Sequence, residues 1–278
     1  MNIGGQALVE GVMMRGPTHY SMAVRTPSKK IETKVVHKES PAHRYKKLIF
    51  IRGLLVLVDT LIIGLKALMW SGEKSSDEKI TKKESFFTIL ISLAATILFF
   101  ILIPLWISKL VTSSTLAFNI VDGLLRVLVF VVYVLIIARM KDVKRTFQYH
   151  GAEHMTIACF EDKKALTLKN IKKYSPIHER CGTAFIFIVL ILSIIIFSFI
   201  TSNVFYIKFL SRIVLIPVIA GISYEILKFS ARHPKFFIFK IFVIPGLWFQ
   251  KITTAYPHND QIEVAVASLK ALLKKEKA

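Results

Sequence analysis

The chain has 278 residues, of which 54% are hydrophobic and 20% are charged. Its mean hydropathy of +0.54 excludes an ordinary soluble domain and predicts an integral membrane protein. The formal net charge of +20 predicts a large basic face that binds the anionic head groups of the lipid bilayer. Membrane topology is a simpler cause of this charge than RNA, so no specific nucleic-acid binding is expected.

The N-terminal region predicts a small cytoplasmic cap. Residues 1–17 contain no basic segment followed by an apolar core, so no secretory signal peptide is expected. Residues 3–17 contain glycine at several positions. Because glycine has no side chain, this composition suits a backbone that approaches another group closely. Runs with high β-propensity at residues 20–25 and 31–37 flank a polar turn, which predicts a β-hairpin.

Apolar runs predict four membrane spans, at residues 85–108, 116–140, 183–207 and 209–227, each close to the length of about 20 residues that a bilayer requires. Residues 48–70 are also long enough, but three charged side chains interrupt them, so this segment is expected to be embedded in the membrane. Residues 236–249 are short and broken by Pro-Gly, which predicts an interfacial or re-entrant element. Asp122 and Arg126 are four residues apart in the second span and should pair.

The distribution of positive charge predicts the orientation in the membrane. Residues 139–180 carry ten Lys or Arg, whereas residues 112–120 carry none. The positive-inside rule therefore places the longer loop and both termini on the cytoplasmic side of a bacterial inner membrane. The cysteines Cys159 and Cys181 both belong to this cytoplasmic region, so a metal ligand or a free thiol is expected rather than a structural disulfide.

The sequence His-Gly-Ala-Glu-His at residues 150–154 is the strongest chemical signal of the chain. In a helix each residue turns by about 100°, which places His150, Glu153 and His154 on one face. This H-x-x-E-H spacing is that of the inverted zincins, in which two imidazoles hold zinc and the glutamate takes a proton from the metal-bound water. Glu161, eleven residues after His150, returns to the same face and is expected as a third ligand.

A second cluster, His-Glu-Arg-Cys at residues 178–181, adds an imidazole and a thiol to the same loop. If the two clusters meet in space, His178 and Cys181 become further ligands for a borderline-soft metal such as zinc. The alternative is that these side chains are solvated or pair with nearby Lys and Arg. The remaining candidates for the site are Glu10, Arg15, Glu179, Arg180 and Glu225.

The end of the chain completes the predicted fold. Glu225 lies near the inner surface, where it joins the site or pairs with Lys228 or Arg232. From Asp260 onward the sequence predicts an amphipathic helix that begins with a capping box. The predicted fold class is mainly α: a polytopic membrane helical bundle with about four spans plus an embedded or interfacial helix, and a small cytoplasmic β-hairpin/α cap. The predicted segments are residues 1–47, 48–140, 141–182, 183–257 and 258–278.

Four blocks in this order, spread over nearly the whole chain, resemble the YqhQ-like family of bacterial membrane proteins. They are residues 3–7 with 10–16, residues 150–154, residues 178–183, and residues 253–254 with 261–265. The resemblance implies a metal-dependent enzyme without supplying a reaction. The chain departs from the family's pattern at Met155, where the family has lysine. It departs again at Ala255-Tyr256, where the family has Arg-Glu, so this chain has no acidic side chain at that position.

Two functions follow as alternatives. In the first, His150 and His154 hold a divalent metal, with zinc favoured, together with either Glu161 or His178. Glu153 is then the general base of a hydrolase that acts on a peptide or lipid-linked bond at the cytoplasmic face. In the second, the metal is structural and the basic domain docks onto a translocon, a ribosome or a membrane protease. An open coordination position favours the first function, and a closed shell favours the second.

Overall fold

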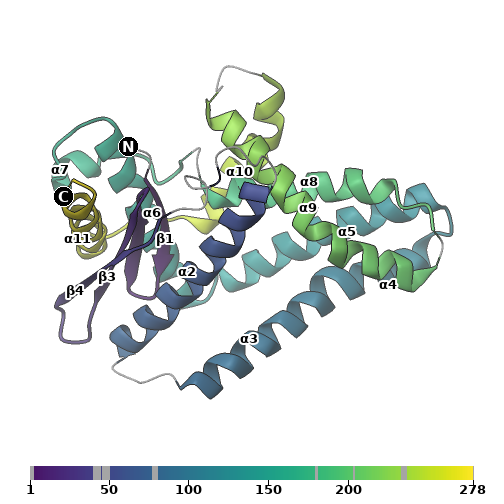
Figure 1. Ribbon diagram of the computed structural model, residues 1–278, viewed down its shortest axis with the longest axis horizontal. Coiled ribbons are helices and arrows are strands. Elements are labelled where there is room, and N and C mark those ends of the chain that lie inside the picture. Colours follow the sequence, from purple (N-terminus) through teal and green to yellow (C-terminus); the bar gives the residue numbers. More distant parts are fainter. Residues whose placement is uncertain are drawn as a thin grey trace.

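A computed structural model describes residues 3–39, 45, 51–76, 81–178, 181–202, 204–232 and 237–277 (Figure 1). The chain is mainly helical, with a small antiparallel sheet at its N-terminus. The helices are α2 (Ile51–Ser76), α3 (Lys82–Ile97), the π-helical η1 (Leu98–Leu102), α4 (Ile103–Val111), α5 (Thr115–Ile137), α6 (Lys141–Glu161), α7 (Leu168–Ile171), α8 (Gly182–Ser198), α9 (Phe205–Arg232), α10 (Phe237–Thr253) and α11 (Asn259–Glu276).

The sheet has four strands in the order β1-β2-β3-β4: β1 (Gly4–Leu8), β2 (Gly11–Arg15), β3 (His19–Arg25) and β4 (Ile31–His37). The hairpin predicted from residues 20–25 and 31–37 is formed by β3 and β4. The glycine-rich residues before it form a second hairpin, β1–β2, which the composition alone did not predict. The turn between β1 and β2 places Glu10 at a φ of 50°.

Helices cover both faces of the sheet (Figure 1). Alternation along β2 sends Val12 and Met14 into a core shared with α6 and α11, where Leu269 is fully buried. The neighbouring Met13 points the other way and packs with Ile63 of α2. The N-terminal sheet, the helix that carries the two histidines and the C-terminal helix therefore form one structural unit.

Four helical segments are long and apolar enough to cross a membrane: Arg52–Ser76, Lys83–Val111, Thr115–Ile137 and Phe205–Ser230. The segment expected only to be embedded, residues 48–70, coincides with the first of them over residues 52–70. Its apolar side chains Leu61, Ile62 and Leu65 are exposed on the face turned away from the sheet. The expected span at residues 183–207 is interrupted, because α8 is only 17 residues long and ends at Ser198, shortly before the polar Thr201-Ser202.

Charged side chains are buried between α5 and α9. The predicted ion pair forms, with Arg126 Nη2 lying 3.2 Å from Asp122 Oδ2. Arg212 of α9 joins it with its Nη2 at 3.0 Å from the same carboxylate oxygen, and it is fully buried. Asn119 accepts a further hydrogen bond of 2.9 Å from Arg212. A single carboxylate thus links two guanidinium groups on two apolar helices.

Candidate metal centre

The His-Gly-Ala-Glu-His sequence lies in the second half of α6, which is helical as predicted. The small residue at position 151 allows this helix to approach the chain after α10 closely. A Cβ at Gly151 would lie 2.0 Å from the backbone oxygen of Ala255. The Ala255 N–H donates a hydrogen bond of 3.0 Å to the oxygen of Phe147, which holds the two segments together. This packing buries His154 and Glu153, which are 3% and 4% exposed.

Backbone carbonyls orient both imidazoles of α6. Nδ1 of His150 lies 2.9 Å from the oxygen of Thr253, and Nδ1 of His154 lies 2.6 Å from the oxygen of Pro176. A carbonyl oxygen can only accept, so each Nδ1 carries the hydrogen and each Nε2 keeps its lone pair. This is the arrangement by which proteins fix histidines that bind a metal.

The thiol of Cys181 brings the second cluster to the first. Its sulfur lies 3.3 Å from Nε2 of His150, and it caps the N-terminus of α8, where the Thr183 hydroxyl donates to it at 3.2 Å. The ligand atoms of His150, His154 and Cys181 all lie within 4.8 Å of one another. Two imidazoles and one thiol form a donor set of the kind that binds a borderline-soft divalent metal.

Burial sets the protonation of the centre. Removal from water raises the pKa of Glu153 to about 8, an effect that the neighbouring His150 opposes. Burial, followed by the proximity of His150, lowers the pKa of His154 to about 3, so this imidazole is neutral at physiological pH. Burial also raises the pKa of Cys181, against the hydrogen bonds from Thr183. Neutral imidazole is the form that binds a metal, whereas the thiol must lose its proton on binding.

Glu153 lies beside the proposed ligands and is covered by β1. Its Oε2 is 3.6 Å from Nε2 of His154. On its other side, a Cβ at Gly5 would lie 2.3 Å from its Oε1, so only glycine fits where β1 passes this carboxylate. The close approach expected of the glycine-rich N-terminal stretch is therefore an approach to Glu153.

Glu161 and His178 lie apart from this group and contact each other, with Glu161 Oε2 at 3.5 Å from His178 Nε2. Eleven residues return Glu161 to the angular position of His150, but they also move it about 16 Å along the helix axis, too far for both to bind one ion. The His178 ring nevertheless remains near the centre, with its centroid 5.6 Å from that of His154. Glu179 and Arg180 lie outside the described residues.

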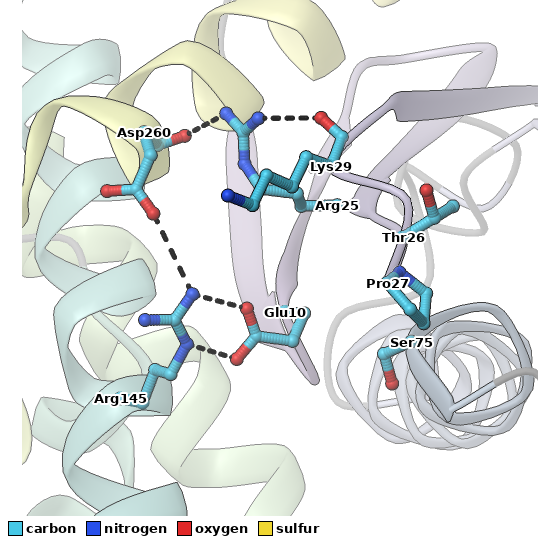
Figure 2. Close-up of a pocket in the computed structure, with 8 residues that line it drawn as sticks. All are labelled: Glu10, Arg25, Thr26, Pro27, Lys29, Ser75, Arg145 and Asp260. Carbon is cyan, nitrogen blue, oxygen red and sulfur yellow. Dashed lines mark hydrogen bonds and ion pairs between the residues drawn. The ribbon is translucent and has the colours of Figure 1, made fainter.

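Glu10, a further candidate, connects the β1–β2 turn to α6. Arg145 Nη2 donates to its Oε2 at 2.6 Å, and the hydroxyl of Tyr149 donates to the same oxygen at 3.2 Å. Figure 2 shows Arg145 also facing Asp260, at 3.7 Å, across a pocket of about 540 Å³. At the edge of this pocket Arg25 donates to the backbone oxygen of Asp260 at 2.8 Å. Both guanidinium groups thus have protein acceptors, and Glu10 is the acceptor that ties Arg145 and Tyr149 of α6 to the β1–β2 turn.

Arg15 and Glu225 also form ion pairs away from the centre. Arg15 of β2 pairs with Asp59 of α2 and ties the sheet to that helix. Glu225 accepts a hydrogen bond of 2.7 Å from Nε of Arg52, so α2 supplies an ion-pair partner of this carboxylate. Neither side chain contributes to the group formed by His150, His154 and Cys181.

Several residues that position the centre were missed in the sequence. Thr253 and Pro176 act through their backbone oxygens, which have no side-chain signature. Gln250 of α10 holds the backbone of His178 in both directions, accepting from its N–H at 2.8 Å and donating to its oxygen at 2.9 Å. The sequence pointed to this region only through Thr253-Thr254, which belong to one of the blocks that resemble the family. That resemblance assigns no function to these two residues.

Comparison with known proteins places the chain among proteins of unestablished activity. A family model described as "Protein of unknown function (DUF1385)" matches residues 48–275. The chain is 33% identical over 294 residues to the "Uncharacterized protein YqhQ" of Bacillus subtilis (strain 168), and the alignment covers 98% of this chain and 92% of that protein. No solved structure matches the chain. The matched regions include the whole candidate centre, and neither description names a reaction.

Proposed function

Because the chain belongs to the DUF1385 family, whose function is unknown, we propose a function from the candidate centre itself. We propose that the protein is a metal-dependent hydrolase bound to the bacterial inner membrane, with its site on the cytoplasmic side. The observation that carries this proposal is the convergence of His150, His154 and Cys181 within 4.8 Å beside the buried carboxylate of Glu153. Three ligands and an adjacent base are the elements of a catalytic zinc site.

Each residue has a separate function in this proposal. His150, His154 and Cys181 would hold the ion, which would polarise a substrate carbonyl and make a water molecule more acidic. Glu153 would accept a proton from the attacking water. Its pKa is about 8 without an ion, and a nearby divalent cation would lower that pKa, so the carboxylate would be ionised when the site is loaded.

The proposed orientation rests on charge and on the shared core. The sheet, α6 and α11 pack into one hydrophobic core, which supports a topology in which the N-terminal strands, the centre and the C-terminal helix would share one side of the membrane. The ten Lys or Arg of residues 139–180 favour the cytoplasm for that side. Anionic lipid head groups are the partners that this basic face would bind.

A structural metal in a docking protein is the second candidate. The imidazole of His178, whose ring centroid is 5.6 Å from that of His154, would be a fourth ligand that closes the coordination shell. The basic domain would then bind a translocon, a ribosome or a membrane protease.

The test compares a change in the base with a change in a ligand. Glu153→Gln keeps the size of the side chain but cannot take up a proton, so it should retain the metal and the fold while hydrolysis of quenched fluorescent peptides and of nitrophenyl esters is lost. His150→Ala should lose metal and hydrolysis together. Glu263→Gln, on a half-exposed side chain of α11, is the matched control and should be unchanged. A Glu153→Gln protein that hydrolyses the probes as fast as the wild type would exclude Glu153 as the base. A metal-loaded wild type that hydrolyses neither probe would exclude the hydrolase and favour the structural metal.

A further inference from the structure

The edge of the sheet beside Glu153 exposes its backbone in a regular pattern. In the described part of the chain β1 pairs with β2 on one side and with no strand on the other. Gly4 and Gly5 of this strand are exposed, while Gln6 and Ala7 are half-buried. An unpaired edge of this kind accepts a further strand.

The hydrogen-bond register shows which backbone groups point outward. Gly16 N–H donates to His19 at 2.9 Å, and Arg25 N–H donates to Glu10 at 2.9 Å, so residues 10 and 16 of this segment bond toward β3. Because bonding alternates along an antiparallel ladder, β2 turns residues 11, 13 and 15 toward β1. Their partners in β1 are Leu8, Gln6 and Gly4, respectively. The backbone groups of Gly5 and Ala7 therefore face away from β2.

These outward groups are available along only part of the edge. Next along the strand, the N–H of Val9 donates to the hydroxyl of Ser71 at 3.2 Å, so α2 closes the edge there. Gly5 and Ala7 have no hydrogen-bond partner for their backbone among the residues that the structure describes. They offer an N–H and a C=O each, repeated at a spacing of about 6.8 Å.

The open part of the edge coincides with the candidate centre. Gly5 is exposed and its Cα faces the buried carboxylate of Glu153, whose Oε1 would be 2.3 Å from an added Cβ. A strand added to this edge would hence pass the carboxylate and the ligands near it. A polypeptide backbone matches the repeated N–H and C=O groups, whereas a lipid ester offers no such repeat.

We propose that the substrate is an extended polypeptide segment that binds along β1 as a fifth strand, bonded to the backbone of Gly5 and Ala7, with a peptide bond next to Glu153. This inference rests on the proposed hydrolase and adds its substrate class. In the reaction, the oxygen of water bonds to the peptide carbonyl carbon and the C–N bond breaks. The leaving nitrogen takes the proton that Glu153 accepted from the water, and no other reactant is consumed.

The test measures peptide binding, not hydrolysis, so it uses the full-length Glu153→Gln protein, in which the bound peptide should not be cleaved. A fluorescent library of extended ten-residue peptides is compared with the same peptides N-methylated at alternate residues, by fluorescence anisotropy. N-methylation should weaken binding about 5–10-fold for each hydrogen bond lost. Equal binding of both sets, or no binding of either, would overturn the proposal.

A backbone change in the protein gives the complementary measurement. Ala7→Pro removes an outward N–H without removing a bond to β2, and proline is tolerated at such edge positions. Ala7→Val adds similar bulk but keeps the N–H, so it is the matched control. Only Ala7→Pro should weaken peptide binding, by about 5–10-fold. Equal affinity of the two variants would count against strand addition.

Ester hydrolysis by the wild type tests the hydrolase separately. If the wild type hydrolyses esters but binds no peptide, the proposed hydrolase is retained and the polypeptide substrate is excluded.

Discussion

Replacing Gly5 by alanine should destabilise the protein by displacing Glu153. The new Cβ would lie 2.3 Å from Oε1 and 2.6 Å from Cδ and Cγ of that side chain, whereas ordinary contact begins at 3.4 Å, so the carboxylate must move by about 1 Å. Glu153 is only 4% exposed and has little room to move. Overpacking of this kind costs about 1–3 kcal/mol, and each kcal/mol lowers Tm by about 2–4 °C in a protein of this size.

The assay is thermal unfolding of the purified protein in detergent, with two comparisons. Gly4→Ala is the matched control, since a Cβ at Gly4 meets nothing within 4 Å. Glu153→Ala removes the atoms that the new methyl group would contact, so Gly5→Ala should cost far less in that background. The resulting coupling free energy should be about 1–3 kcal/mol. Equal costs of Gly5→Ala in both backgrounds, or equal effects at Gly4 and Gly5, would refute the placement of β1 against Glu153.

Burial raises the pKa of Glu276, but hydrogen bonds from two backbone amides at the β2–β3 turn outweigh it and hold the pKa below 4.5. Glu276→Gln should therefore lower the free energy of unfolding by about 1–3 kcal/mol at pH 7, and the difference should vanish as the pH falls below 4.5. Asp122→Asn leaves two buried guanidinium groups without a carboxylate and should cost about 3–5 kcal/mol; a loss below about 1 kcal/mol would show that the charges are solvated. Cysteines at the exposed Lys29 and Lys164 should both react with an impermeant thiol reagent only after the inner membrane is opened, and labelling of either in intact spheroplasts would contradict the proposed orientation.

Local sequence signals made part of the fold predictable. The high β-propensity of residues 20–25 and 31–37 around a polar turn predicted the β3–β4 hairpin, and the four-residue spacing of Asp122 and Arg126 predicted their ion pair. The β1–β2 hairpin was not predicted, because a glycine-rich sequence permits many conformations. Its strand pairing depends on the helices that cover both faces of the sheet.

Helix geometry predicts the candidate ligands that share one helix, whereas Cys181 was a candidate only on the condition that the two clusters meet in space. His150 and His154 are four residues apart, and their common face follows from helix geometry alone. Angular position suggested Glu161 as the third ligand, but displacement along the axis places it beside His178. Cys181 reaches the centre from the start of α8, and this depends on how α8 packs on its neighbours. The orienting carbonyls depend on tertiary structure in the same way.

Elemental analysis of the purified protein measures whether His150, His154 and Cys181 bind a metal. We expect about one zinc ion per chain in the wild type, in Glu153→Gln and in Glu161→Gln, because the proposed ligand set includes neither glutamate. His150→Ala, His154→Ala and Cys181→Ala should each lose most of the bound metal. A wild-type protein without stoichiometric metal, or a Cys181→Ala protein that keeps it while Glu161→Gln loses it, would rule out this ligand set.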